Sequence, residues 1–119
     1  ILVSHLASRP AAAHVAGALL VAPADVETMA RKDSRFASFA PLPRHELTFP
    51  SIVVASRNDN YMSFAKAEAL ANIWGSGFVD VGHAGHINVE SGFSRWPEGS
   101  ILASSLHREP IRHTLSQAA

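Results

Sequence analysis

Three short apolar runs, separated by longer polar segments, dominate the hydrophobic pattern of the chain. The first spans residues 15–22 and ends at Pro23, the second is centred on the β-branched residues 52–54, and the third is FVDVG, residues 78–82. Short runs without polar alternation are typical of parallel strands that are covered on both faces. The pattern therefore predicts three strands, and Asp25 after the first is a candidate N-cap for a helical turn.

The segment SFAKAEALANIWG, residues 63–75, carries the clearest helical pattern. Ser63 can accept a backbone hydrogen bond as N-cap, and Gly75 can end the helix in the left-handed conformation. Apolar side chains recur at helical spacing between these two residues, so we expect one buried stripe. Its members are Phe64, Ala67, Leu70, Ala71 and Trp74.

Weaker patterns complete the predicted order of elements. Residues 1–8 are expected to be the end of a helix that Pro10 terminates. Residues 28–50 contain three prolines and are expected to be a surface connection with one short helical turn. A last helix is expected from about Ser100 to about Ser116, with a break near Pro110. The alternation of strands and helices predicts an α/β fold with a parallel sheet.

Composition narrows the class of protein. The chain has 119 residues, of which 47% are hydrophobic, so one modest domain with a packed core is expected. Ten basic residues balance ten acidic ones, and no apolar stretch has the length of a membrane span, so neither nucleic acid nor a membrane is expected as a partner. The absence of cysteine excludes disulfides and thiolate catalysis and fits a reducing compartment, and we expect a cytoplasmic protein.

Ionisable side chains follow the second and third predicted strands, at the points where these strands end. Asp59 lies in ASRNDNY, and His83 and His86 lie in VGHAGHIN. Because functional residues gather at the carboxyl ends of parallel strands, neighbouring strands would bring the two loops together. A carboxylate beside an imidazole holds one tautomer and stabilises the protonated ring, as a general base for a hydroxyl nucleophile requires.

Other interpretations of these residues stay open at this point. His86 also fits a polar surface position in a glycine-rich turn, and Asp59 within NDN also fits an Asx turn. Asp80, His83 and His86 are the types of residue that bind metals, but histidines three apart in a glycine turn have no fixed geometry. We therefore expect no metal site, and we expect His83 to be a solvated turn residue.

The same segments resemble the C-terminal half of the small α/β-hydrolases of the RBBP9/YdeN serine-hydrolase family. ALLVAPADVE, ASRNDNY, GHAGHIN and SGFSRWPEG occur in the family's order and spacing, over roughly residues 16–102. The resemblance implies a parallel-sheet α/β-hydrolase fold and a triad in the chain order Ser, Asp, His, with Asp59 as the acid and His86 as the base. It also implies cleavage of an ester or related acyl bond in a small-molecule or peptide-like substrate, without a cofactor. Asn60 departs from the family, in which a proline is common at this position.

The chain lacks a nucleophile that fits this pattern. The fold requires a G-x-S-x-G turn, and no two glycines of the sequence are four apart. Ser4 is followed by His5 but lacks the small neighbours that the turn needs. The resemblance places the serine and the oxyanion-hole amides before residue 1, so that residues 1–119 are expected to be the C-terminal part of one hydrolase domain, inactive alone. The open edge of its sheet is then expected to pair with the missing half or with another copy.

Two other functions stay open. A chain without a nucleophile also fits a non-catalytic binding or interaction module that keeps a hydrolase scaffold. A metal-dependent hydrolase that uses His83 and His86 is a third possibility, and it would lose activity on chelation. The pairing of Asp59 with His86, together with the resemblance, favours the serine hydrolase.

Overall fold

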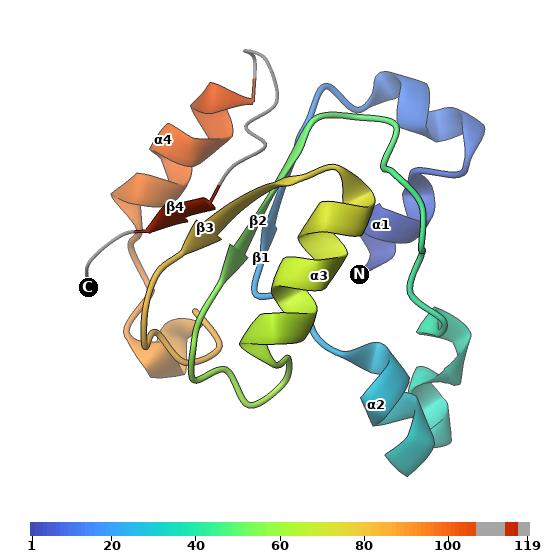
Figure 1. The fold of residues 1–119 in the computed structure, drawn as a ribbon, viewed down its shortest axis with the longest axis horizontal. Coiled ribbons are helices and arrows are strands. Elements are labelled where there is room, and N and C mark those ends of the chain that lie inside the picture. The colour runs from blue at the N-terminus through green and yellow to red at the C-terminus, as the bar shows by residue number, and fades with distance from the viewer. Residues whose placement is uncertain (107–113, 117–119) are drawn as a thin grey trace.

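A parallel sheet forms the centre of the structure, a computed structural model that describes residues 1–106 and 114–116 (Figure 1). Its strands lie in the order β1-β2-β3-β4, and each neighbouring pair is parallel. The sheet confirms the α/β class, and its first three strands confirm those that the apolar runs predict. The strands within the described residues are β1 (Ala18–Val21), β2 (Ser51–Ala55), β3 (Gly77–Asp80) and β4 (Thr114–Ser116).

The end of the chain differs from the sequence prediction. The periodicity predicts one helix from about Ser100 to about Ser116, whereas α4 spans Pro97–Ser105 and Thr114–Ser116 forms β4. The helix begins earlier because a proline suits the first helical position, where its missing N–H costs nothing. The strand forms because β3 offers backbone partners along its edge, a long-range contact that no local pattern reveals. Residues 107–113, with the expected break at Pro110, lie outside the described residues.

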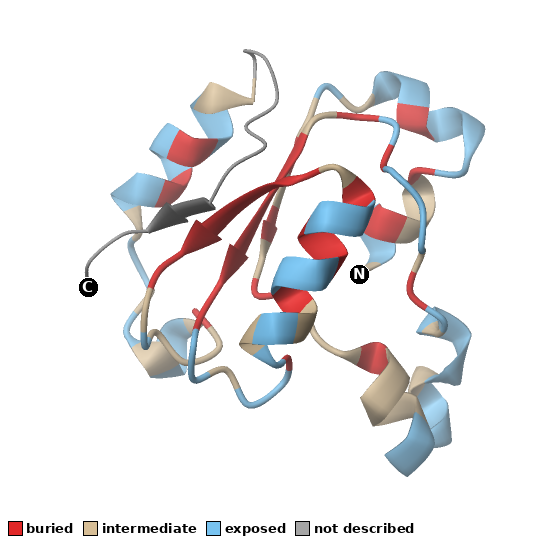
Figure 2. Ribbon diagram, in the orientation of Figure 1, coloured by how far each residue is buried: buried red, intermediate tan, exposed pale blue. Residues whose placement is uncertain are grey.

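Helices cover both faces of the sheet. α3 (Phe64–Trp74) joins β2 to β3 and lies on the same side as α1 (Leu2–Leu6), whereas α4 lies on the other side (Figure 1). Val53 packs in the core under α3, and its neighbour Val54 packs with Leu102 of α4. Figure 2 shows the buried residues concentrated in β1, β2 and β3 and on the inner side of α3. Within the described part of the chain, every helix is too short to cross a membrane.

α3 has the bounds that its sequence pattern predicts. Ser63 caps its N-terminus, since the backbone N–H of Lys66 donates to Ser63 Oγ at 3.2 Å. Gly75 ends the helix in the left-handed conformation, with φ 68°. Phe64 is partly buried and packs against the core. The other four members of the predicted stripe are buried, which confirms their place in the core: Ala67, Leu70, Ala71 and Trp74.

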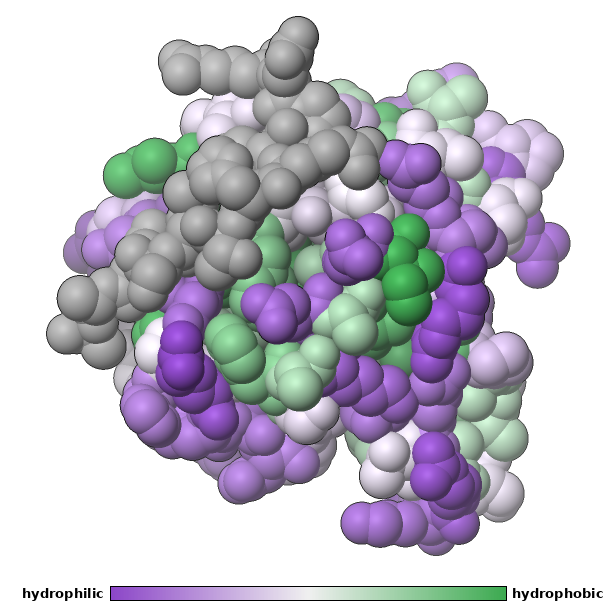
Figure 3. Space-filling model, viewed as in Figure 1, coloured by the Kyte–Doolittle hydropathy of each residue, from purple (hydrophilic) through white to green (hydrophobic). Residues whose placement is uncertain are grey.

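A separate lobe follows β1. α2 (Val26–Lys32) begins at Asp25, whose Oδ1 accepts the backbone N–H of Thr28 at 3.1 Å, and this confirms the predicted N-cap. The segment 28–50 is more helical than predicted, because α2 extends into it and a 3-10 turn follows. Figure 3 shows a notch at the lower margin of the molecule, between this lobe and the rest of the surface. The 3-10 turns of the described residues are Pro10–His14, Ser34–Phe39 and Val89–Ser91.

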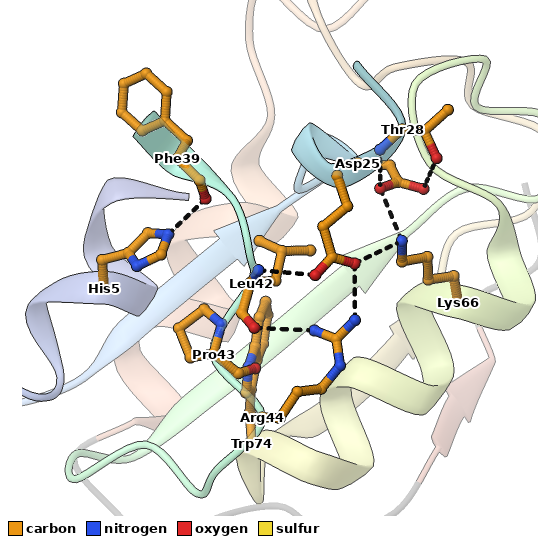
Figure 4. Close-up of polar contacts among 10 residues, drawn as sticks. His5, Asp25, Thr28, Phe39, Leu42, Pro43, Arg44, Lys66 and Trp74 are labelled. Atoms are coloured by element: carbon orange, nitrogen blue, oxygen red, sulfur yellow. Dashed lines mark hydrogen bonds and ion pairs between the residues drawn. The ribbon is translucent and has the colours of Figure 1, made fainter. Parts of the chain in front are cut away.

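Charged side chains tie the lobe to α3 (Figure 4). Lys66 Nζ lies 2.8 Å from Asp25 Oδ1 and 2.9 Å from Glu27 Oε1. The other Glu27 oxygen accepts the backbone N–H of Leu42 at 2.9 Å, and Arg44 donates to Glu27 Oε1 at 2.7 Å. Burial alone would raise the pKa of Glu27, but the hydrogen bonds from Lys66, Arg44 and the Leu42 amide lower it to about 2. The cluster therefore fixes α2 relative to α3.

Candidate active site

Asp59 and His86 meet at the carboxyl edge of the sheet. Asp59 lies in the loop after β2 and His86 in the loop after β3, and His86 Nδ1 lies 3.1 and 3.0 Å from Asp59 Oδ1 and Oδ2. The Asp59 side chain is only 3% exposed, whereas that of His86 is 29% exposed. The structure thus brings these two predicted site residues together, with the carboxylate covered and the imidazole open to solvent on one side.

The contact determines which nitrogen of His86 is available. An ionised carboxylate only accepts hydrogen bonds, so the proton of the neutral imidazole sits on Nδ1. Nε2 then carries the lone pair, and it has no hydrogen-bond partner among residues 1–106. A histidine in this state is able to take a proton at Nε2 while Asp59 stabilises the resulting positive charge.

Tyr61 supports both members of the pair. Its backbone N–H donates to Asp59 Oδ1 at 2.8 Å. Its ring lies against the His86 imidazole, with 4.6 Å between the ring centroids and an angle of 50° between the planes. Tyr61 is not among the site residues predicted from the sequence. Its position two residues after Asp59, as in an Asx turn, is the local signal that identifies it.

Two further side chains join the loop after β2 to the loop after β3. Asn58 Oδ1 accepts the backbone N–H of Gly85 at 2.8 Å, and Ser56 Oγ accepts that of Ala84 at 2.9 Å. Ser56 in turn donates to Asn58 Oδ1 at 2.9 Å. We call Ser56 and Asn58 the loop clamp. No local sequence pattern indicates the loop clamp, because its partners are backbone amides 27 and 28 residues away.

The backbone on both sides of His86 adopts the left-handed conformation. Gly85 has φ 60°, and a Cβ at this position would lie 2.5 Å from Ser91 Oγ. Ile87 has φ 52°, which costs a β-branched residue about 1–2 kcal/mol. The side chain of Ile87 is buried in the core on the α4 side of the sheet, and this packing offsets the strain. The tight turn directs His86 back toward Asp59.

Asp80 and His83 lie in different surroundings and do not form a shared metal site. Asp80 is buried at the end of β3, where its Oδ2 accepts from Arg57 Nε at 2.8 Å and its Oδ1 accepts the Gly82 N–H at 2.8 Å. The hydrogen bond from Arg57 lowers the pKa of Asp80 against the opposing effect of burial, so this carboxyl group stays ionised. His83 is exposed, which confirms a solvated turn residue. Within the described ranges, no group of three or more His, Asp or Glu residues is placed to hold a metal ion.

Ser4 lies in a different part of the molecule. It is buried in α1, and its hydroxyl donates to the Ile1 carbonyl at 2.6 Å. His5 contacts the Phe39 carbonyl at 2.7 Å through Nε2 (Figure 4). Both side chains are therefore engaged with backbone groups, and Ser4 offers no exposed hydroxyl for attack on a substrate.

Comparisons with known proteins identify the family that the chain resembles. A family model described as serine hydrolase matches residues 1–105. A crystal structure described as a YdeN-like hydrolase from Pectobacterium atrosepticum is 35% identical, with a TM-score of 0.74, and its match covers 88% of this chain. The same match covers 52% of that protein, so the present chain spans about half of its length. No curated protein matches the chain significantly.

Proposed function

Because the chain belongs to the YdeN-like serine hydrolase family, we propose that it supplies the acid and the base of a Ser-Asp-His triad. Asp59 is the proposed acid and His86 the proposed base. The observation that carries this proposal is the contact of His86 Nδ1 with both oxygens of the covered Asp59 carboxylate. The proposed reaction is the cleavage of an ester or related acyl bond in a small-molecule or peptide-like substrate.

The proposed mechanism has two halves. In the first, His86 Nε2 takes the proton of the serine hydroxyl as the serine oxygen attacks the acyl carbon, and Asp59 stabilises the imidazolium. His86 then gives that proton to the leaving alkoxide, and the alcohol departs from an acyl-enzyme. In the second half, His86 Nε2 takes a proton from a water molecule as the water oxygen attacks the acyl carbon. His86 then gives this proton to the serine oxygen, so that the carboxylic acid leaves and the serine hydroxyl is restored. No cofactor takes part.

We propose that the serine comes from sequence outside residues 1–119. The chain has no G-x-S-x-G segment, Ser4 is buried, and the match covers only 52% of the YdeN-like hydrolase. β1 is an edge strand of the described sheet, and a pocket of about 180 Å³ lies beside it, lined by Ile1 and by residues 19–21 among others. Such an apolar edge suits a further strand, from the same polypeptide, a second one or another copy.

A non-catalytic binding module is the second candidate, and the missing nucleophile motif favours it. An experiment on the polypeptide as encoded, including any sequence before Ile1 or after Ala119, distinguishes the hydrolase from the binding module. A serine-directed fluorophosphonate probe should label this protein, and labelling should disappear in His86→Ala. The matched control is His83→Ala, an exposed histidine of the same loop that should keep its labelling.

The outcomes discriminate between all three functions. Absence of labelling in the complete protein overturns the hydrolase and favours the binding module. Labelling that His83→Ala and His86→Ala reduce equally overturns the proposed role of His86. Ester hydrolysis that EDTA abolishes would indicate the metal-dependent hydrolase instead. The cytoplasmic location stays a prediction that cell fractionation tests.

A further inference from the structure

A pocket of about 570 Å³ adjoins the Asp59–His86 pair through Tyr61. It lies between the lobe that holds α2 and the loop that joins β2 to α3, and residues 60–63 form its wall on the loop side. The same Tyr61 that borders the pocket has its ring against the His86 imidazole. A molecule in the pocket is therefore separated from the proposed base by one aromatic side chain. The volume lies within the range of small-molecule sites in proteins.

The apolar part of the lining is adaptable. Met29 of α2 and Met62 of the loop both border the pocket, and Met62 is buried beneath it. Methionine side chains are unbranched and flexible, so they adjust to chains of different shape. This lining suits a run of methylene groups better than a rigid polar ligand.

The charged part of the lining has one group without a partner. Asp25 borders the pocket, but its carboxylate already accepts from Lys66 Nζ at 2.8 Å and from the Thr28 hydroxyl at 2.8 Å. Lys32, at the end of α2, also borders the pocket. Among the residues that the structure describes, it has no hydrogen-bond or ion-pair partner. The lining therefore presents one available positive charge and no available negative charge.

We propose that this pocket binds the part of the substrate remote from the scissile bond, and that Lys32 selects substrates that carry a carboxylate there. The inference rests on the proposed hydrolase function and specifies its substrate class. An ammonium group donates charge-assisted hydrogen bonds to a carboxylate, whereas it repels a cationic substrate and leaves a neutral chain unpaired. The substrate class is an acyl ester whose carbonyl is joined through several methylene groups to a terminal carboxylate.

The test compares two esters with the same acyl chain length and the same leaving group. They are 4-nitrophenyl hexanoate, whose acyl chain ends in a methyl group, and the mono-4-nitrophenyl ester of adipic acid, whose acyl chain ends in a carboxylate. In the complete encoded polypeptide, kcat/KM should be about three- to tenfold higher for the adipate ester, the range expected of one partly exposed charge-assisted hydrogen bond. The preference should weaken when the salt concentration rises, because ions screen an exposed charge.

Lys32→Gln should remove the preference, and Arg31→Gln is the matched control. Arg31 is the preceding residue of α2, is exposed and is not part of the pocket lining, so its replacement removes the same charge without changing the pocket. Both residues are exposed at the end of a helix, and a thermal melt checks that both variants fold.

Each result has one meaning. Hydrolysis of neither ester by a protein that the fluorophosphonate probe does not label overturns the proposed hydrolase function, whereas hydrolysis of neither ester by a protein that the probe labels overturns the proposed substrate class alone. Hydrolysis of both esters at equal kcat/KM, or an equal loss of preference in Lys32→Gln and Arg31→Gln, overturns the carboxylate pocket and leaves the hydrolase function standing. A preference that only Lys32→Gln removes supports the inference.

Discussion

The side-chain oxygen of Asn58 accepts the backbone N–H of Gly85 at 2.8 Å, next to the residue that carries the proposed base. Asn58 itself directly precedes Asp59. One amide side chain therefore connects the two loops at the positions adjacent to both members of the pair. The distance between Asp59 and His86 consequently depends on Asn58 as well as on the pair itself.

Asn58→Ala should lower kcat about ten- to a hundredfold, because small misplacements of a catalytic group have effects of this size. KM should change much less, since Asn58 does not border the pocket. Steady-state kinetics on 4-nitrophenyl hexanoate measure both constants. Asn72→Ala, an exposed asparagine on α3, is the control that should leave both unchanged. A merely structural role of Asn58 would instead lower the melting temperature without a specific loss of kcat.

Tyr61→Ala should lower kcat about two- to tenfold, whereas Tyr61→Phe should retain it. The ring of Tyr61 packs against His86, and an aromatic contact of this kind contributes about 0.5–1.5 kcal/mol. The backbone N–H that supports Asp59 is present in all three proteins, so the comparison isolates the ring. The same kinetic assay measures the effect. Equal losses in Tyr61→Ala and Tyr61→Phe would instead assign the effect to the hydroxyl group.

The main features of the fold follow from local sequence patterns. The bounds of α3 were predictable because its cap, its apolar stripe and its final glycine all act within one helix. The meeting of Asp59 and His86 was predictable because neighbouring parallel strands end at the same edge of a sheet. Each of these inferences needs only the type of element and the order of the strands.

Other features depend on contacts that no local pattern contains. β4 forms through pairing with β3, whereas periodicity alone predicts a helix for its three residues. The loop clamp of Ser56 and Asn58 depends on amides of a loop that follows the next strand. The ion pairs of Lys66 join two helices that are distant in sequence. Side-chain contacts between loops require the assembled sheet, which positions both loops first.

Gly85→Ala should destabilise the protein more than Gly92→Ala does. Both glycines have positive φ, 60° and 91°, so alanine is strained at each position. Only at Gly85 would the added Cβ also meet a neighbour, Ser91 Oγ at 2.5 Å, whereas nothing lies within 4 Å at Gly92. The excess loss in the free energy of unfolding should be about 1–3 kcal/mol, the usual cost of overpacking. Urea unfolding measures it.

The double variant Gly85→Ala/Ser91→Ala isolates the steric contact at Gly85. Removal of Ser91 Oγ should lower the cost of Gly85→Ala, measured in the Ser91→Ala background, toward that of Gly92→Ala, because only Ser91 Cβ, at 3.2 Å, then remains close to the added Cβ. Because the turn carries His86, Gly85→Ala should also lower kcat, and the double variant should recover part of it. An unchanged cost in the Ser91→Ala background would show that the Ser91 contact plays no part.

Acid should weaken the folded state through Glu27. Hydrogen bonds from Lys66, Arg44 and the Leu42 amide outweigh the effect of burial and lower the pKa of Glu27 to about 2, below the ordinary value of 4.5 that applies in the unfolded chain. A group with a depressed pKa in the folded state contributes stability above its unfolded pKa, and this stability is lost as the pH falls from about 4.5 toward 2. The contribution at neutral pH is at most about 3–4 kcal/mol, since one pKa unit corresponds to about 1.4 kcal/mol and the pKa of Glu27 falls from 4.5 to about 2.

Glu27→Gln should therefore lower the free energy of unfolding at pH 7 and flatten its decline between pH 4.5 and 3. Urea unfolding at several pH values measures both effects on the complete encoded polypeptide. Glu68→Gln is the matched control, because Glu68 is exposed on α3 and has no part in the cluster of Glu27, Lys66 and Arg44. It should reproduce the pH dependence of the unmodified protein. If the free energy of unfolding declines equally steeply with falling pH in both variants, the acid sensitivity belongs to other carboxylates. Asp25, which accepts hydrogen bonds from Lys66 and Thr28, is then the next residue to replace.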